Sequence, residues 1–290
     1  NNKLNYLKAW FEVLKLNFKA PKYDLVHSHY GLSGIIASFQ FRIPNIISFC
    51  GSDLLMLQSK GYKSLSLFNL LIVNLMVKIG ILVSNRASGI IVKSEQMNKI
   101  LDFRAKVIPS GVNTSFFIPL DVKISRRALN LDLEKKYVLF LSDPISQNKN
   151  YPLAQESVRK LSINCKNVVL LTVHNRSRFE VLLYLNSCDV LILTSYYEGS
   201  PNVVKEALSC NVPVVSVDVG DVSNIIKDVK NTHLCEHDSD SISEGLNRVI
   251  EKGGKSTGRD KIISLGIDQD TICDRILDLY KNTLISVKYN

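Results

Sequence analysis

The sequence lacks several features that mark specialised classes of protein. Its six cysteines, at positions 50, 165, 188, 210, 235 and 273, include no Cys-x-x-Cys pair. We interpret them as reduced core residues of a cytosolic protein. No signal-peptide pattern opens the sequence. No nucleic-acid motif and no cluster of basic and aromatic residues is present, so nucleic acid is not an expected partner.

The most apolar stretch, residues 64–83, lacks the composition of a membrane span. A span needs about 20 apolar residues with few charges. Here Lys78, Asn69, Asn74 and Gly80 interrupt the apolar run. We therefore expect a buried helix, with membrane contact as the alternative.

Acidic residues are scarce in residues 1–120, which hold 14 Lys and Arg but only 5 Asp and Glu. Residues 121–290 hold 22 of each, so the net charge of +9 resides entirely in the first part. This predicts an anionic partner for that part, such as an anionic membrane surface or a phosphate-bearing acceptor.

The opening residues 4–19 have the pattern of an amphipathic helix, with apolar residues at helical spacing and lysines between them. The apolar positions are Leu4, Leu7, Phe11, Leu14 and Phe18. We expect this helix to pack on a sheet, with a membrane-surface helix as the alternative. Lysines 3, 8, 15 and 19 are then its surface contacts.

The length of 290 residues predicts about two domains. Apolar strand patterns alternate with helical patterns along most of the chain. This alternation predicts an α/β fold with parallel sheets. A final amphipathic helix is expected over residues 268–284.

The stretch from Asp189 to Glu206 has the clearest local organisation. Residues 190–194 read as a buried parallel strand, and Glu198-Gly199 as the turn after it. Ser200 suits an N-cap and Pro201 the first position of a helix that runs towards Cys210. The strand's carboxyl end therefore meets the helix's amino end at Gly199-Ser200, where an open α/β sheet holds an anionic ligand.

This junction predicts a ligand with a diphosphate and sugar on both sides of it. Pro201 has no N–H group, so the anion is expected to contact the amides that remain. Glu198 lies at the rim, and Glu206 lies roughly 7.5 Å along the helix axis. A carboxylate is a poor phosphate ligand but a good acceptor for vicinal hydroxyls. The amide donors are expected at Ser200, Asn202, Val203 and Val204, and Gly199 is expected in the same donor-binding turn.

The motif Glu-Gly-Ser-Pro-Asn-x-x-x-Glu-Ala from Glu198, followed by Pro213-Val-Val and Val219-Gly220, resembles the donor-site signature of retaining GT-B glycosyltransferases of family four. The resemblance implies two Rossmann-like domains with parallel sheets facing a cleft. It implies that Glu198 contacts the donor sugar and Glu206 the ribose.

Four further positions take roles from this resemblance. Asp24-Leu-Val-His-Ser-His resembles the segment whose second histidine faces the donor sugar, which places His29 there and leaves His27 as a structural, hydrogen-bonded residue. Gly51 and Asp53 match the turn that lines the acceptor side in the family. Cys50 occupies a position where the family commonly has a histidine. The alternative role for Asp53 is the N-cap of the following helix. Lys149 matches the lysine that binds the diphosphate.

The resemblance also predicts the domain limits. Lys106-Val-Ile-Pro-Ser-Gly-Val-Asn113 and Phe116 resemble the crossing between domains. We expect an acceptor-side domain over residues 1–119, lacking the family's first strand and glycine-rich loop. A donor-binding domain over 120–267 and a terminal helix over 268–290 that crosses back should follow. Ser142 and Asp143 replace the Gly-Arg pair often found in the family.

The implied activity is retaining transfer of a hexosyl unit from a nucleotide-diphosphate sugar, with a UDP-sugar favoured and neither a metal nor another cofactor expected. The expected acceptor is a glycan or lipid-linked glycan in surface polysaccharide assembly, with the protein cytoplasmic or peripheral at the inner face of the membrane. The alternatives are a sugar-nucleotide epimerase of the same fold and a non-catalytic sugar-nucleotide-binding module.

Two patterns resemble metal sites. His233, Cys235 and His237 alternate on an expected strand, and we interpret this spacing as coincidence. Asp238-Ser-Asp240 precedes a helical pattern, so helix capping explains it better than a metal does.

Overall fold

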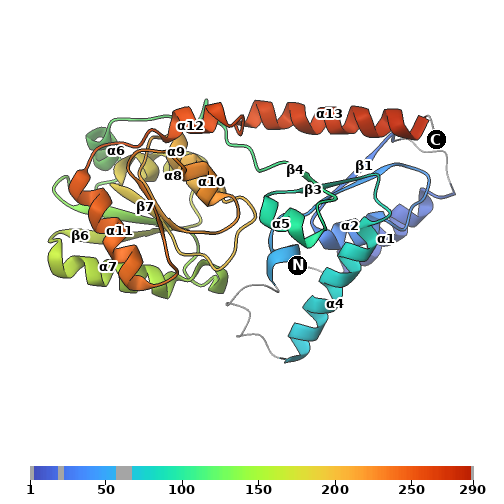
Figure 1. The fold of residues 1–290 in the computed structure, drawn as a ribbon, viewed down its shortest axis with the longest axis horizontal. Helices are drawn as coiled ribbons and strands as arrows, with labels where there is room; N and C mark the ends of the chain where they lie inside the picture. The colour runs from blue at the N-terminus through green and yellow to red at the C-terminus, as the bar shows by residue number, and fades with distance from the viewer. Residues whose placement is uncertain (1–2, 19–22, 57–66, 289–290) are drawn as a thin grey trace. The chain divides into compact units, whose positions relative to one another are not determined.

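The computed structural model describes residues 3–18, 23–56 and 67–288. The chain forms two compact units, one made of Asn1–Pro109 with Cys273–Asn290 and the other of Ser110–Ile272. Each unit contains one parallel sheet with helices packed around it (Figure 1). The α/β class with two parallel sheets is therefore confirmed.

The first unit has a four-stranded sheet in the order β1-β2-β3-β4. Its strands are β1 (Val26–His29), β2 (Asn45–Ser48), β3 (Gly89–Val92) and β4 (Lys106–Val107). All four positions of β2 are buried, as expected for a central parallel strand. His29 pairs with Ser48, and Ser48 with Ile91, so the residues that follow these strands share one edge of the sheet.

Helices of very different lengths accompany this sheet. They are α1 (Lys3–Lys15), α2 (Gly31–Ala37), α3 (Ser52–Leu55), α4 (Leu67–Ser84), α5 (Glu95–Ile100) and α13 (Gln269–Lys288). Helix α13 packs along the sheet from the far end of the chain. Its Arg275 donates to the Val107 carbonyl at 2.8 Å, and its Tyr280 hydroxyl lies 2.5 Å from His27 Nδ1.

Helix α4 corrects the expectation of a buried helix over residues 64–83, of which residues 64–66 lie outside the described part. Only a narrow stripe with Val77 and Gly80 packs inward, where Gly80 approaches Phe49. The opposite face is apolar and exposed, at Phe68, Leu71, Leu75 and Leu82 among others. The apolar composition runs around the whole helix, but only one stripe has a packing partner. None of the helices in the described chain combines the length and apolar content that a bilayer crossing requires.

Helix α1 also packs less than its pattern predicts. Its Trp10 ring meets Phe39 edge to face, with ring centroids 5.8 Å apart. Leu7 and Phe11, both expected to pack on a sheet, are each 56% exposed. The expectation of a sheet-packed helix is therefore wrong for these positions, since α1 contacts the α2 region instead.

The second unit has a five-stranded parallel sheet in the order β6-β5-β7-β8-β9. Its strands are β5 (Lys136–Leu141), β6 (Val168–Val173), β7 (Val190–Leu193), β8 (Val214–Val217) and β9 (Thr232–Cys235). The helical elements are α6 (Val122–Ala128), η3 (Gln147–Lys149), α7 (Tyr151–Asn164), α8 (Arg178–Ser187), α9 (Asn202–Ser209), α10 (Val222–Ile226), α11 (Ser239–Lys252) and α12 (Gly258–Ser264). Strand β7 is the central strand and is fully buried, so it fixes the point at which the following segment begins.

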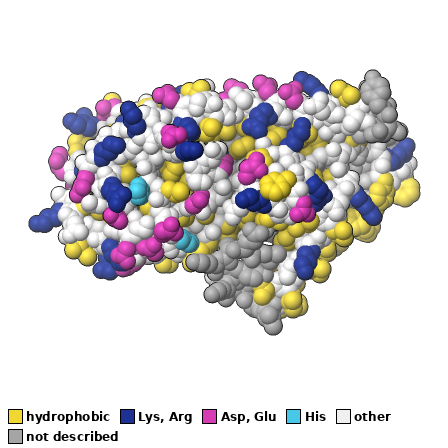
Figure 2. All heavy atoms as spheres, viewed as in Figure 1, with side chains coloured by type: hydrophobic (Ala, Val, Ile, Leu, Met, Phe, Trp, Pro, Cys, Tyr) yellow, Lys and Arg dark blue, Asp and Glu magenta, His cyan; other side chains and the backbone are white. Residues whose placement is uncertain are grey.

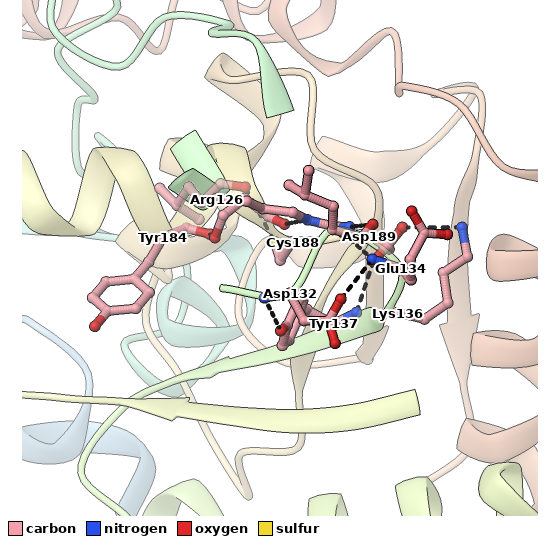
Figure 3. Close-up of polar contacts among 11 residues, drawn as sticks. Arg126, Asp132, Glu134, Lys136, Tyr137, Tyr184, Cys188 and Asp189 are labelled. Atoms are coloured by element: carbon pink, nitrogen blue, oxygen red, sulfur yellow. Dashed lines mark hydrogen bonds and ion pairs between the residues drawn. The ribbon is translucent and has the colours of Figure 1, made fainter. Parts of the chain in front are cut away.

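Figure 3 shows an ion-pair cluster at the amino ends of β5 and β7. Arg126 of α6 donates to Asp189 Oδ2 at 2.8 Å, and also to the carbonyls of Leu133 and Ser187. The same Asp189 oxygen accepts the Tyr137 amide at 2.7 Å. Because the buried guanidinium is paired and hydrogen-bonded, the cluster joins α6 to the sheet at the ends of the strands opposite to the predicted site.

Candidate functional site

The predicted site lies where β7 leads into α9. Helix α9 begins at Asn202, with Pro201 as its N-cap in extended conformation and without a side-chain cap. The expected positions of Ser200 as N-cap and Pro201 as first helical residue are therefore wrong by one residue. Asn202, Val203 and Val204 now open the helix, so their amides have no intrahelical carbonyl one turn before them. They remain the predicted anion donors.

The Ser200 hydroxyl cannot cap the helix because two buried groups engage it. It donates to Asp221 Oδ2 at 2.6 Å and accepts from Lys205 Nζ at 2.6 Å. The Lys205 ammonium also donates to the Ser110 carbonyl at 2.6 Å. Lys205 is fully buried. These three side chains, Ser200, Lys205 and Asp221, form a network that fixes the turn before α9 from beneath.

Sequence reasoning missed this network. The available signal was a lysine between Val204 and Leu208, which lie on the buried face of the helix. Burial raises the pKa of Asp221, while the charge of Lys205 and the Ser200 hydrogen bond lower it. The network is therefore a lysine and a carboxylate that compensate each other inside the unit.

Gly220 allows the chain to pass close to the same turn. Its φ of +64° is in the left-handed region, and an added Cβ would lie 2.8 Å from the carbonyl oxygens of Glu198 and Gly199. A side chain here would thus meet both backbone strain and a backbone collision. The close approach places Asp221 within reach of Ser200.

Lys149 and Glu198, predicted to bind different parts of one ligand, are paired with each other. Lys149 Nζ lies 2.5 Å from Glu198 Oε1, and Ser195 Oγ donates to the same oxygen at 2.8 Å. The side chains are 28% and 14% exposed, so the pair lies at the surface of the site. The structure brings the predicted cation and carboxylate together at the carboxyl end of β7.

The loop that carries Lys149 is tied to the end of β7. Thr194 Oγ1 donates to the carbonyls of Lys149 and Asn150, at 2.9 and 3.1 Å. Asn148 Nδ2 donates to the Tyr197 carbonyl at 3.0 Å, and Asn150 has a left-handed φ of 49°. These bonds hold Lys149 beside Glu198 without the Gly-Arg pair that Ser142 and Asp143 replace.

Glu206 lies on α9, about one helical turn after the start of the helix, and is half-buried. Burial raises its pKa, and the charge of Arg178 lowers it. Arg178 opens α8, and its guanidinium stacks over the rings of Phe116 and Phe117, at 5.0 and 5.5 Å from their centroids. Sequence reasoning did not identify Arg178, because the stacking depends on a segment more than sixty residues away.

A cavity of about 560 Å³ opens at the carboxyl ends of β5 and β6. Its lining combines polar and apolar residues: Leu141, Ser142, Asp143, Val173, His174, Asn175, Arg176 and Val181. The segment His174-Asn175-Arg176 is the rim predicted to face a nucleotide base. Its place on the cavity suits that role, which stays a prediction.

In the first unit, His27 and His29 lie on one face of β1, with ring centroids 4.2 Å apart. His27 is hydrogen-bonded through both ring nitrogens, to Tyr280 and, at 2.8 Å, to Ser48. Its structural role is thus confirmed. Burial lowers the pKa of His27 to about 4, with added contributions from His29 and Lys93. His29 is exposed at the end of the strand, and its contact with the donor sugar stays a prediction.

Asp53 holds two turns together on the predicted acceptor side. Its carboxylate accepts the amides of Gly31, Cys50 and Gly51 at 2.8–3.0 Å. Gly51, with φ 143°, is the N-cap of α3, so Asp53 is not the cap. Burial raises the pKa of Asp53, while these amide bonds lower it. The carboxylate therefore organises the turn that contains Gly51.

The metal look-alikes have structural explanations. Asp238 caps α11 by accepting the amides of Asp240 and Ser241, which confirms the capping interpretation. His233 and Cys235 pack against Gly245 of α11. Within the described ranges, no group of three or more His, Cys, Asp and Glu side chains is arranged to hold a metal ion.

Comparison with known proteins relates this site to one family. Residues 168–263 match the model of the family Glycosyl transferases group 1. The chain is 25% identical over 248 residues to the putative teichuronic acid biosynthesis glycosyltransferase TuaC of Bacillus subtilis, covering 78% of this chain and 61% of that protein. It thus spans about three fifths of that relative's length.

A second relative is named N,N'-diacetylbacillosaminyl-diphospho-undecaprenol alpha-1,3-N-acetylgalactosaminyltransferase, from Campylobacter jejuni. It is 24% identical over 208 residues, covering 61% of this chain and 54% of that protein.

Solved structures show the fold. Sucrose-phosphate synthase from Thermosynechococcus elongatus matches with a TM-score of 0.75 at 19% identity, covering 98% of this chain and 80% of that one. Anabaena Alr3699/HepE in complex with UDP matches with a TM-score of 0.70 at 18% identity, covering 96% and 82%. These likenesses establish a GT-B fold for the chain.

Proposed function

We propose that the chain is a group 1 glycosyl transferase, because residues 168–263 match the model of that family, and that it transfers a hexosyl unit from a UDP-sugar to a glycan or lipid-linked glycan acceptor. The observation that carries the proposal is the junction of β7 and α9. There Glu198 lies in the turn before α9, and the opening amides of α9 and Glu206 follow it along the chain.

The donor's diphosphate is proposed to lie at the start of α9. The amides of Asn202, Val203 and Val204 point along the helix axis from its positive end, which favours negative charge. Lys149, which is paired with Glu198 at the carboxyl end of β7, is proposed to add a positive charge on the diphosphate. The Ser200–Lys205–Asp221 network holds the backbone of the turn in place, so little reorganisation is needed when the ligand binds.

The two ends of the donor are proposed to meet the two glutamates. Glu206 accepts the ribose hydroxyls, and Glu198 accepts hydroxyls of the donor sugar. Glu198 is already oriented by Ser195 and Lys149. UDP is favoured as the nucleotide because the structurally similar Anabaena protein is described in complex with UDP.

The proposed reaction retains the configuration of the sugar. As the bond between sugar and diphosphate breaks, negative charge develops on the leaving phosphate, where the helix amides and Lys149 stabilise it. The same phosphate takes the proton of the attacking hydroxyl, so no side chain needs to act as general base. His29 is proposed to contact the donor sugar, and Gly51 and Asp53 to shape the acceptor side.

The acceptor is proposed to be associated with an anionic membrane. The first unit carries the chain's excess positive charge. Hydrophobic and basic side chains lie together on the surface over α4 (Figure 2). Beside that helix is a largely apolar cavity of about 210 Å³, lined in part by Met56, Ile72 and Met76. The Campylobacter relative carries a lipid-linked acceptor in its name, which supports the same class here.

Mass spectrometry of products from a panel of nucleotide sugars tests the proposed function. The protein with a membrane extract or a polyprenyl-phosphate glycan should add one hexose from at least one UDP-sugar. A protein that binds UDP but releases none from any UDP-sugar would be a binding module instead. Isomerised donor without transfer would indicate an epimerase.

Transfer should be independent of divalent metal. The α9 amino terminus and Lys149 supply the positive charge in this account, so a chelator should change the rate of UDP release by less than about twofold. Removal of a catalytic metal would instead remove several kcal/mol of transition-state stabilisation and nearly abolish the activity. Initial rates with EDTA, and with EDTA followed by Mn²⁺, check this. Activity that is lost with EDTA and restored by Mn²⁺ would overturn the helix-terminus account.

Binding to anionic vesicles should fall steeply with added salt. Each basic residue near an anionic surface contributes about 1 kcal/mol and is screened beyond roughly 10 Å at 0.1 M salt. Replacing Lys8 and Lys15 by glutamine should weaken co-sedimentation further. Lys3 and Lys19, also expected to contribute, lie outside the described side chains. The matched control replaces Lys252 and Lys255, both exposed on the second unit. Equal weak binding to anionic and neutral vesicles at low salt would refute the membrane proposal.

A further inference from the structure

Lys93 is a partly buried cation at the carboxyl edge of the first sheet. It follows β3 directly, and the pairing of Ser48 with Ile91 places it near Cys50, which follows the neighbouring strand β2. Its Nζ lies 3.4 Å from the Ile108 carbonyl. No carboxylate of the described residues lies within ion-pairing distance of it. Burying a charge without a counter-ion is costly, so this position calls for an anion.

The carboxylate of Asp53 does not fill that need. Both of its oxygens accept backbone amides, from Gly31, Cys50 and Gly51. Its charge therefore reaches Lys93 only at a distance. Burial lowers the pKa of Lys93, although the charges of Cys50 and Asp53 raise it. The ammonium thus keeps hydrogen-bonding capacity that a ligand can use, since lysine carries three donors.

Two neighbours strengthen this position as a binding site. His29 is the last residue of β1 and lies at the same carboxyl edge of the sheet as Lys93. Burial and the charge of Lys93 lower the pKa of His29. Ser94, the next residue in the chain, is 2% exposed, and its hydroxyl has no hydrogen-bond partner among the described residues. An anion beside Lys93 would relieve the charge repulsion on His29.

We propose that Lys93, with His29 beside it, binds an oxyanion of the acceptor, either a phosphate or a carboxylate. The inference rests on the proposed function, because it assigns this edge of the first unit to the acceptor. It deepens that function by naming an acidic acceptor. A charge-assisted contact from a half-buried ammonium is stronger than one from a solvated surface lysine. Neither the family signature nor the predicted site residues include Lys93.

Chemical footprinting tests the site on the intact chain. Acetylation of Lys93 by acetic anhydride is followed by peptide mass spectrometry, with UDP at saturation so that the donor site is occupied. Methyl phosphate and glucuronate serve as the two probes. Lys99, exposed on α5 six residues later, is the reference in the same sample. We expect one probe to slow acetylation of Lys93 about tenfold, the effect of one charge-assisted hydrogen bond, and to leave Lys99 unchanged.

The probe that protects identifies the anion: methyl phosphate a phosphate-bearing acceptor, glucuronate an acidic sugar. Lys93→Met should weaken binding of that probe about tenfold in an NMR titration, whereas Lys93→Arg should retain much of it and Lys99→Met all of it. Equal protection of Lys93 and Lys99, or no protection by either probe, would overturn the site. Protection by UDP alone would also overturn it, because the anion would then come from the donor.

The two proposals can fail separately. Protection of Lys93 in a protein that transfers no sugar would leave the anion site standing and refute the proposed function. Sugar transfer without protection of Lys93 would leave the proposed function standing and refute the anion site.

Discussion

The Lys205→Met variant should lose about 3–5 kcal/mol of unfolding free energy, the typical cost of removing one partner from a buried charge pair. The variant would leave the Ser110 carbonyl and the Ser200 hydroxyl without their donor. It would also leave Asp221 buried with no compensating cation. Urea unfolding of the two proteins at pH 7 measures the difference.

The pH dependence and a second substitution separate this electrostatic cause from simple loss of packing. A buried aspartate without a cation has a raised folded-state pKa, so it destabilises the fold only where the unfolded aspartate is ionised. The deficit should therefore shrink as the pH falls towards the ordinary range of an aspartate. Asp221→Asn combined with Lys205→Met should recover part of the loss. A deficit that is unchanged by pH and by the second substitution would refute the charge-compensation account.

Glu198→Ala should lower the turnover of the donor about 10²–10³-fold, the range seen when one preorganised stabilising group is removed. Glu198 is proposed to hold the donor sugar, and it also positions Lys149 through their 2.5 Å contact. Steady-state release of UDP measures the loss. Glu180→Ala is the matched control, because Glu180 is an exposed glutamate on α8 whose partners are Ser177 and Arg176.

Glu198→Gln separates the two roles of this side chain. The amide keeps an acceptor for sugar hydroxyls but loses the charge that pairs with Lys149. Activity that recovers in Glu198→Gln would assign the main effect to hydroxyl binding, and activity that stays low would assign it to the Lys149 pair. Wild-type turnover in Glu198→Ala would contradict the catalytic assignment of Glu198.

Much of the proposed donor site can be predicted from the sequence because it depends on local patterns. A buried strand, a turn and a helix occur within Val190–Ser209, and the polar residues at the turn can only lie at the carboxyl edge of a parallel sheet. Thr194 then explains why Lys149 lies beside Glu198, since it binds the carbonyl of Lys149. Such short-range geometry follows from strand and helix periods.

The errors and omissions come from contacts between distant segments. Capping preferences predict Ser200 as the N-cap of α9. Its hydroxyl instead donates to Asp221 and accepts from Lys205, and capping preferences predict neither contact. Lys205 itself reaches Ser110, 95 residues earlier. The apolar composition of α4 predicts a buried helix, yet burial requires a partner surface on every side of the helix. Lys93 stands out only once the strand register is known.

The most direct test of the central claim is calorimetric titration of UDP into the wild type, Glu198→Ala and Glu206→Ala. Glu206 is half-buried and proposed to accept the ribose hydroxyls, so its removal should weaken UDP binding about 10–100-fold, the cost of losing hydrogen bonds to a charged group. Glu198 is proposed to contact only the sugar, so Glu198→Ala should bind UDP nearly as well as the wild type. Equal losses of UDP affinity in both variants would contradict the assignment of the two glutamates to opposite ends of the donor.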